Sequence, residues 1–156
     1  MVRYVLSMPH LFREARDLAE DVRRVFEELE RRDARRTISG ECVPALDVLE
    51  TAQAIQIVVD LPGVQPEDVR VLIKGGVVLI AGEKAPTTCS SRDASFHLVE
   101  RGFGRFARVA RLTGAFDAAR ASATIQAGEL RVVIPRIEER RGREIAVPVR
   151  PIDRVS

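Results

Sequence analysis

The chain has 156 residues, of which 46% are hydrophobic, enough for one domain with its own core plus extensions. Its 25 basic and 23 acidic residues nearly balance, which disfavours a nucleic-acid-binding protein with a concentrated basic face. No apolar run reaches the length of about 20 residues that a membrane span needs, and the N-terminus lacks the apolar core of a secretory signal peptide. We therefore expect a cytoplasmic protein without a membrane span.

Residues 9 to about 36 have the spacing of an amphipathic helix. Apolar residues recur there at steps of three and four, with Arg, Glu and Asp between them. The apolar stripe includes Phe12, Leu18, Val22 and Phe26. Such a stripe needs a surface to cover it. Two alternatives stay open: the helix packs on its own domain, or the stripe meets other subunits or other proteins. Its mixed polar face disfavours a helix that lies on a membrane.

From Pro44 to Ile134 the apolar pattern changes to a period of two, which is typical of strands. Turn residues such as Gly75-Gly76 and Ala127-Gly128 separate the apolar segments. The predicted strands are residues 46–50, 55–59, 69–74, 77–81, 106–112, 121–125 and 130–134. Short strands at this spacing, without a long helix between them, favour an antiparallel β-sandwich.

Between Lys84 and Val99 the sequence becomes polar, which predicts a long loop. A loop of that length in a compact domain is usually functional or disordered. The residues Phe96, His97, Leu98 and Val99 predict a short strand near its end.

No residue set in the sequence predicts catalysis. The histidines, His10 and His97, have no credible Ser/His/Asp or Cys/His context, and Gly102-Phe103-Gly104 lacks the further glycine of a dinucleotide site. Cys42 and Cys89 are too few and too far apart for a disulfide framework or a zinc site, so we expect free thiols, with a redox role for Cys89 left open. These features favour a binding protein that is not an enzyme and uses no metal or cofactor.

A charged tether follows Pro135 and ends in a short apolar segment at residues 145–149. The alternate apolar side chains of Ile145 and Val147 are suited to pockets beside the sheet of another molecule. The segment is therefore a candidate intermolecular clip, and the alternative is a frayed tail.

Four sequence segments, in this order, resemble the small heat-shock protein (α-crystallin domain) family across residues 42–149. They are 44–48 with 58–64, 67–84 with its closing Gly-Glu-Lys, 100–108 with Gly-x-Phe-x-Arg, and 123–130 with Ala-x-x-x-x-Gly-x-Leu. Ala127 departs from the family pattern, which usually has Asn before this glycine.

The resemblance implies an all-β, immunoglobulin-like antiparallel β-sandwich, the α-crystallin domain, over residues 42–136. An N-terminal helical arm would occupy residues 1–41, and a flexible C-terminal tail with the Ile-x-Val motif would occupy residues 137–156. The implied function is that of an ATP-independent holdase chaperone, a homo-oligomer built from dimers, with no cofactor. Its partners would be copies of itself and non-native client proteins. A co-chaperone module and a shell protein that holds no clients are the rival readings.

The resemblance also implies where the binding sites lie. The dimer interface would contain the loop strand, which pairs with the partner's sheet edge, and an arginine in an ion-pair network; its residues are Phe96, His97, Leu98, Val99 and Arg108. Ile145 and Val147 of one subunit would fill a groove on another, lined by Val69, Val71, Ile73, Ala123 and Ile125. After dissociation, clients would meet the helix stripe of Phe12, Leu18, Val22 and Phe26.

Overall fold

The computed structural model describes residues 8–32, 40–88 and 91–137, with side chains from residue 14 onward. The described chain contains one α-helix, seven strands and two short 3-10 helices. They are α1 (Met8–Arg32), β1 (Leu46–Glu50), β2 (Ala54–Asp60), β3 (Val69–Lys74), β4 (Val77–Lys84), β5 (Gly104–Arg111), β6 (Ser122–Gln126) and β7 (Glu129–Pro135), with the 3-10 helices at Pro66–Asp68 and Ala118–Arg120. The seven predicted strands are confirmed within a few residues at their ends.

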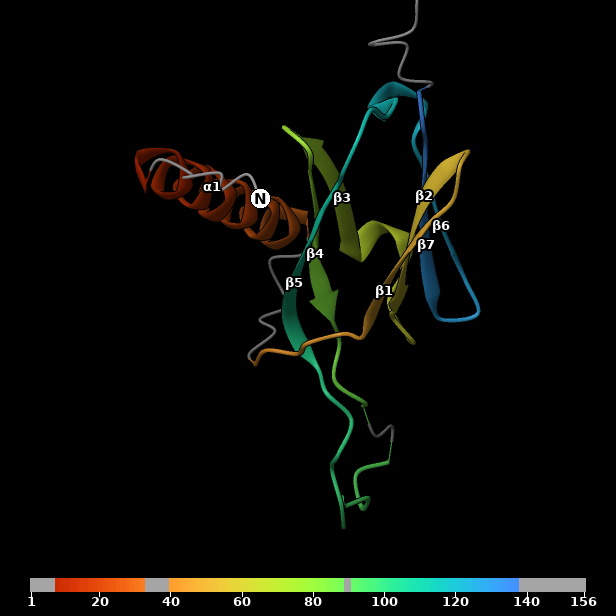
Figure 1. Ribbon diagram of the computed structural model, residues 1–156. Helices are drawn as coiled ribbons and strands as arrows, with labels where there is room; N and C mark the ends of the chain where they lie inside the picture. Colours follow the sequence, from red (N-terminus) through yellow and green to blue (C-terminus); the bar gives the residue numbers. More distant parts are fainter. Residues whose placement is uncertain (1–7, 33–39, 89–90, 138–156) are drawn as a thin grey trace, which may run out of the picture.

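The strands form two antiparallel sheets that face each other (Figure 1). One sheet has the order β1-β2-β7-β6, and the other has the order β3-β4-β5. β1 and β6 are therefore the edges of the larger sheet, and β3 and β5 are the edges of the smaller one. This arrangement confirms the predicted sandwich.

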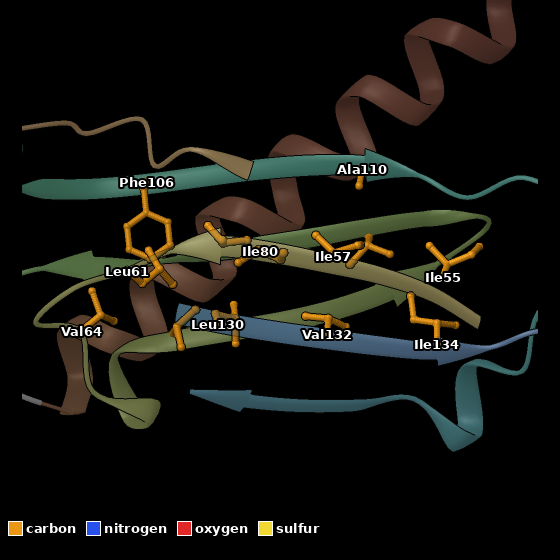
Figure 2. Packing of buried hydrophobic residues seen from close by; sticks show 13 residues of the cluster. Ile55, Ile57, Leu61, Val64, Ile80, Phe106, Ala110, Leu130, Val132 and Ile134 are labelled. Atoms are coloured by element: carbon orange, nitrogen blue, oxygen red, sulfur yellow. The ribbon is translucent and has the colours of Figure 1, made fainter. Parts of the chain in front are cut away.

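The core lies between the sheets, where alternate side chains of the strands point inward (Figure 2). Ile55, Ile57 and Val59 of β2 are register partners of Ile134, Val132 and Leu130 of β7. Val78 and Ile80 of β4, together with Phe106 and Ala110 of β5, close the core from the other sheet. Burial of each large aliphatic side chain contributes about 1.5–3 kcal/mol before conformational entropy is counted, so this cluster is the main source of stability.

Gly82 allows β4 to pass close to the start of β3. A Cβ atom at this position would lie 2.4 Å from the carbonyl oxygen of Asp68 and 2.8 Å from the Phe106 ring. Only glycine fits between such neighbours, which explains physically why the Gly-Glu-Lys triplet begins with it.

β4 is buried on both faces, because α1 covers the outer side of its sheet (Figure 1). Leu79 and Ala81 point outward and form a second buried cluster with Val25 and Leu29 of α1. Leu18, Val22 and Phe26 of α1 and Leu72 of β3 pack against this cluster. Of the two alternatives for the helix, the described chain shows the first: the stripe packs on its own domain.

The predicted strand at Phe96–Val99 does not form in the single chain, and its pairing with a partner's sheet edge stays a prediction. Residues 91–103 form no strand, and the loop extends away from the sandwich (Figure 1). The physical reason is that a strand requires a neighbour for its backbone hydrogen bonds, and no described strand lies beside this segment. The predicted end of the helix, at about residue 36, lies outside the described residues.

Candidate interaction surfaces

The predicted groove residues lie on two sheet edges that border the same core. Val69 is buried on β3, while Val71 and Ile73 are partly buried and pack against the core cluster. On β6, Ile125 also packs against this cluster, whereas Ala123 is exposed. The structure thus places all five predicted residues along β3 and β6, the edges of different sheets.

The loop after β4 exposes apolar side chains. Leu98 is 72% exposed, and Phe96, Val99 and His97 are exposed beside it. The edge strand β1 also has exposed apolar residues, Val48 and Leu49. Apolar groups on a loop and on an unpaired sheet edge are typical of surfaces that bind another chain.

Arg108 lies at the centre of the edge strand β5 and is partly buried. Its side chain lies on the same face of β5 as those of Phe106 and Ala110, which point into the sandwich. Within the described ranges its guanidinium makes no ion pair or hydrogen bond. A partly buried cation of this kind is best stabilised by a carboxylate, and no described residue of the same chain supplies one.

Arg105, which was not predicted as a site residue, joins α1 to the sandwich. It is the register partner of Glu83 on β4, and its Nε lies 3.2 Å from Glu83 Oε1. Its guanidinium also pairs with Glu30 of α1 and lies 5.0 Å from the centre of the Phe26 ring. The hydrogen bond from Arg105 to Glu30 raises the pKa of Arg105, burial partly opposes this effect, and the further interactions with Glu30 and Glu83 add to it, so Arg105 stays charged at all ordinary pH values. The strand alternation alone could have placed Arg105 on the outer face, but not its helix partner.

Cys42 packs beside the first residues of β5. Its Sγ lies 3.7 Å from the carbonyl oxygen of Gly104. Burial raises the pKa of the Cys42 thiol, and the nearby Lys84 offsets part of this effect. A thiol with a raised pKa is a weak nucleophile at neutral pH.

A model of the Hsp20/alpha crystallin family matches residues 47–150, which is well over half of the chain. The chain belongs to the small heat-shock protein family. Heat shock protein 16 of Schizosaccharomyces pombe is 35% identical to it over 103 residues, which is 65% of this chain and 72% of that protein. The resemblance inferred from the four sequence segments is therefore confirmed.

Solved structures of small heat-shock proteins have the same fold. The protein from Xylella fastidiosa matches with a TM-score of 0.58 and 32% identity, covering 69% of this chain and 98% of that chain. Heat shock protein 16.0 of S. pombe matches with a TM-score of 0.57 and 31% identity, covering 69% and 99% of the two chains.

Small heat-shock proteins are generally non-enzymatic chaperones that form oligomers and bind client proteins. Among the side chains that the structure describes, no group of three or more His, Cys, Asp or Glu residues could hold a metal ion. No helix in the described part of the chain is long and apolar enough to cross a membrane. Ile145, Val147, Cys89 and the side chain of Phe12 lie outside the described residues.

Proposed function

We propose that this small heat-shock protein is an ATP-independent holdase of the cytoplasm that binds unfolding proteins and prevents their aggregation. It works as a homo-oligomer built from dimers. The observation that carries this proposal is the set of uncovered apolar groups and sheet edges that a single chain presents: the loop residues Phe96, Leu98 and Val99, and the strand β1. Such surfaces are stabilised when another chain covers them.

The dimer forms when the loop of one subunit adds a strand to the other. Residues 96–99 become ordered against a partner's sheet edge, for which β1 is suitable because it is unpaired on one side and bears Val48 and Leu49. This also explains why the segment contains no strand in the single chain. Arg108 then pairs with a carboxylate that the partner brings to the edge strand β5.

Dimers join through the C-terminal clip. Ile145 and Val147 of one subunit bind between β3 and β6 of another, beside the partly buried Val71, Ile73 and Ile125. Two aliphatic side chains supply about 1.5–3 kcal/mol each before the tether is ordered, so a single clip is weak. Several clips in one oligomer hold it together by multivalency, and heat releases them one at a time.

Client proteins are held mainly by apolar contacts. Leu18, Val22 and Phe26 of α1, joined by Phe12, supply these contacts after the oligomer dissociates and α1 detaches from its own sheet. Capture of an unfolding chain requires no mechanical work, and therefore no nucleotide. The X. fastidiosa relative, which is described as having a distinct high order structure, supports assembly by analogy.

Two measurements on the purified chain test this proposal: its native mass by light scattering, and its suppression of a client's heat aggregation without ATP. We expect a mass of many subunits and strong suppression. A stable monomer, or an oligomer that leaves client aggregation unchanged, would overturn the holdase assignment.

The clip is tested by the double variant Ile145→Gly and Val147→Gly. We expect its mass to fall toward that of a dimer. Ala146→Gly, which adds similar backbone freedom without removing either clip side chain, is the matched control and is expected to keep the parent mass. An unchanged mass in the double variant would exclude the clip.

A further inference from the structure

The outer face of the β3-β4-β5 sheet is apolar, although the outer face of a sandwich sheet is ordinarily polar. Leu72, Leu79 and Val109 are register partners on the three strands and form one apolar row across that face. Ala81 and Ala107 continue the apolar surface in the next row. The sheet therefore has two apolar sides, and only the inner one is needed to form the sandwich core.

Basic side chains surround this outer face, and acidic side chains of α1 pair with them. The distances are 3.5 Å for Arg111 to Glu14, 3.5 Å for Lys74 to Asp21 and 4.0 Å for Arg70 to Glu28, and Arg105 pairs with Glu30. The pairs follow α1 from its second turn to its last. In one further contact the charges are reversed, because α1 supplies the cation: Arg32 lies 3.9 Å from Glu67 and 3.9 Å from Asp68. The surface thus combines an apolar centre with a mainly basic rim.

α1 fills this surface only partly. A pocket of about 290 Å³ remains between the N-terminal half of the helix and the sheet, and Leu18, Leu72 and Val109 are among its lining residues. Val109 stays 42% exposed. The only α1 side chains buried in the described part of the helix are Val25 and Leu29, near its C-terminal end. The face is therefore larger than the helix that covers it.

We propose that the outer face of β3-β4-β5 is a docking surface for amphipathic helices of client proteins whose apolar stripe is flanked by acidic residues. α1 occupies this surface as an internal substitute for such a helix. The proposal rests on the proposed holdase function, since it names the site and the class of client segment. The apolar row supplies affinity, as in other helix-in-groove complexes, and the basic rim selects for acidic flanks.

The covalent link gives α1 a high effective concentration, so it excludes weak competitors. The ion pairs at its edges are at least partly solvent-exposed, and each contributes little. Heat or salt that loosens α1 therefore opens the surface while the sandwich stays folded. Client helices then compete for a face that is already formed.

The experiment uses two fluorescein-labelled peptides of residues 8–32 and measures their anisotropy with the full chain. One peptide has the natural sequence. The other carries Glu14→Gln, Asp21→Asn, Glu28→Gln and Glu30→Gln, which removes the four acids that face the basic rim. We expect the natural peptide to bind about tenfold more tightly, and this difference to shrink in 1 M salt. Equal binding of the two peptides, or no binding of either, would overturn the proposal.

A matched pair of full-chain variants tests whether α1 competes for the same surface. Glu30→Arg places a cation beside Arg105, whereas Glu27→Arg changes a residue that pairs with Arg23 on the helix itself. The two glutamate side chains are almost equally exposed, at 55% and 54%. We expect Glu30→Arg to raise the affinity for the natural peptide several-fold and Glu27→Arg to leave it unchanged. Equal affinities in the two variants would contradict competition by α1.

The aggregation assay separates this inference from the proposed function. If the chain suppresses client aggregation but the two peptides bind equally or not at all, the docking surface is excluded and the holdase function stands. If the peptides bind as expected but aggregation is not suppressed, the sheet binds acidic amphipathic helices, but the holdase function is excluded and client proteins are not the occupants.

Discussion

The β3-β4-β5 sheet makes two contacts that differ in kind. Its inner face joins a core of thirteen buried residues drawn from five strands and the chain between β2 and β3. Its outer face contacts α1 through a cluster of four buried residues, with partly exposed ion pairs around them. β4 belongs to both, because Val78 and Ile80 point inward while Leu79 and Ala81 point outward.

The proposed function assigns stability to the inner contact and client binding to the outer one. The inner contact is extensive and cannot open without unfolding the domain. The outer contact depends on few buried groups and on ion pairs of modest strength, so we expect it to open before the inner contact does. A chaperone that must expose apolar surface on heating, yet stay folded, requires both kinds of contact in one molecule.

The strongest test of the inner contact is Ile57→Ala. Ile57 is fully buried between the sheets, so the substitution leaves a cavity. We expect the free energy of unfolding to fall by about 2–5 kcal/mol, measured by urea denaturation. A loss below about 1 kcal/mol would show that the core is less tightly packed than its burial indicates.

Leu29→Ala applies the same kind of test to the outer contact. Leu29 is buried against β4, and we expect α1 to detach while the sandwich persists. The loss in the free energy of unfolding is therefore limited to the docking energy of the helix, and we expect about 2 kcal/mol at most, the lower end of the range for buried leucines. If urea denaturation gave a loss as large as that of Ile57→Ala, the helix and the sandwich would unfold as one unit.

Ala127→Asn is expected to stabilise the sandwich without changing the contact between α1 and the sheet. Ala127 has a φ of 51° in the turn between β6 and β7, a left-handed conformation that Asn adopts more readily than Ala. We expect a gain of about 0.5–1 kcal/mol in urea denaturation, with no change in the hydrogen exchange of α1. Slower exchange in α1 would show that the two contacts are coupled.

The smallest expected effect concerns the thiol of Cys42, which packs on the sandwich beside the start of β5. Its pKa in the folded chain is raised above the ordinary value of 9.0, chiefly by burial, so folding favours the protonated thiol. The corresponding stability is present below pH 9.0 and is lost as the pH rises through the folded pKa. In a Cys89→Ser background at pH 9, iodoacetamide should modify Cys42 more slowly in the folded chain than in the urea-unfolded chain. Equal rates would contradict a raised pKa.

The strands could be predicted from the sequence because their signals are local. Alternation along β2 and β7 and the glycines of the turns specify them without knowledge of the fold. Residues 96–99 also have strand-like composition, yet they form no strand in the single chain, because pairing depends on a neighbour that composition does not reveal. The local sequence pattern thus predicts which segments can form strands, but not which neighbour each of them pairs with.

The helix contact could be predicted only in part. The periodicity of α1 shows that one side needs cover, but not which surface provides it. Arg105 illustrates the gap, since its pairing with Glu30 joins residues far apart in the sequence. The structure places the predicted groove residues Val71, Ile73 and Ile125 on the edge strands β3 and β6, whereas their binding of Ile145 and Val147 remains a prediction.

Hydrogen exchange measured at rising temperature tests the two-contact account most directly. Mass spectrometry can compare a peptide from α1 with peptides from β2 and β7 in the same sample. We predict that the α1 amides lose protection at temperatures where the β2 and β7 amides are still protected. Loss of protection in α1, β2 and β7 at the same temperature would contradict an outer contact that opens while the sandwich stays folded.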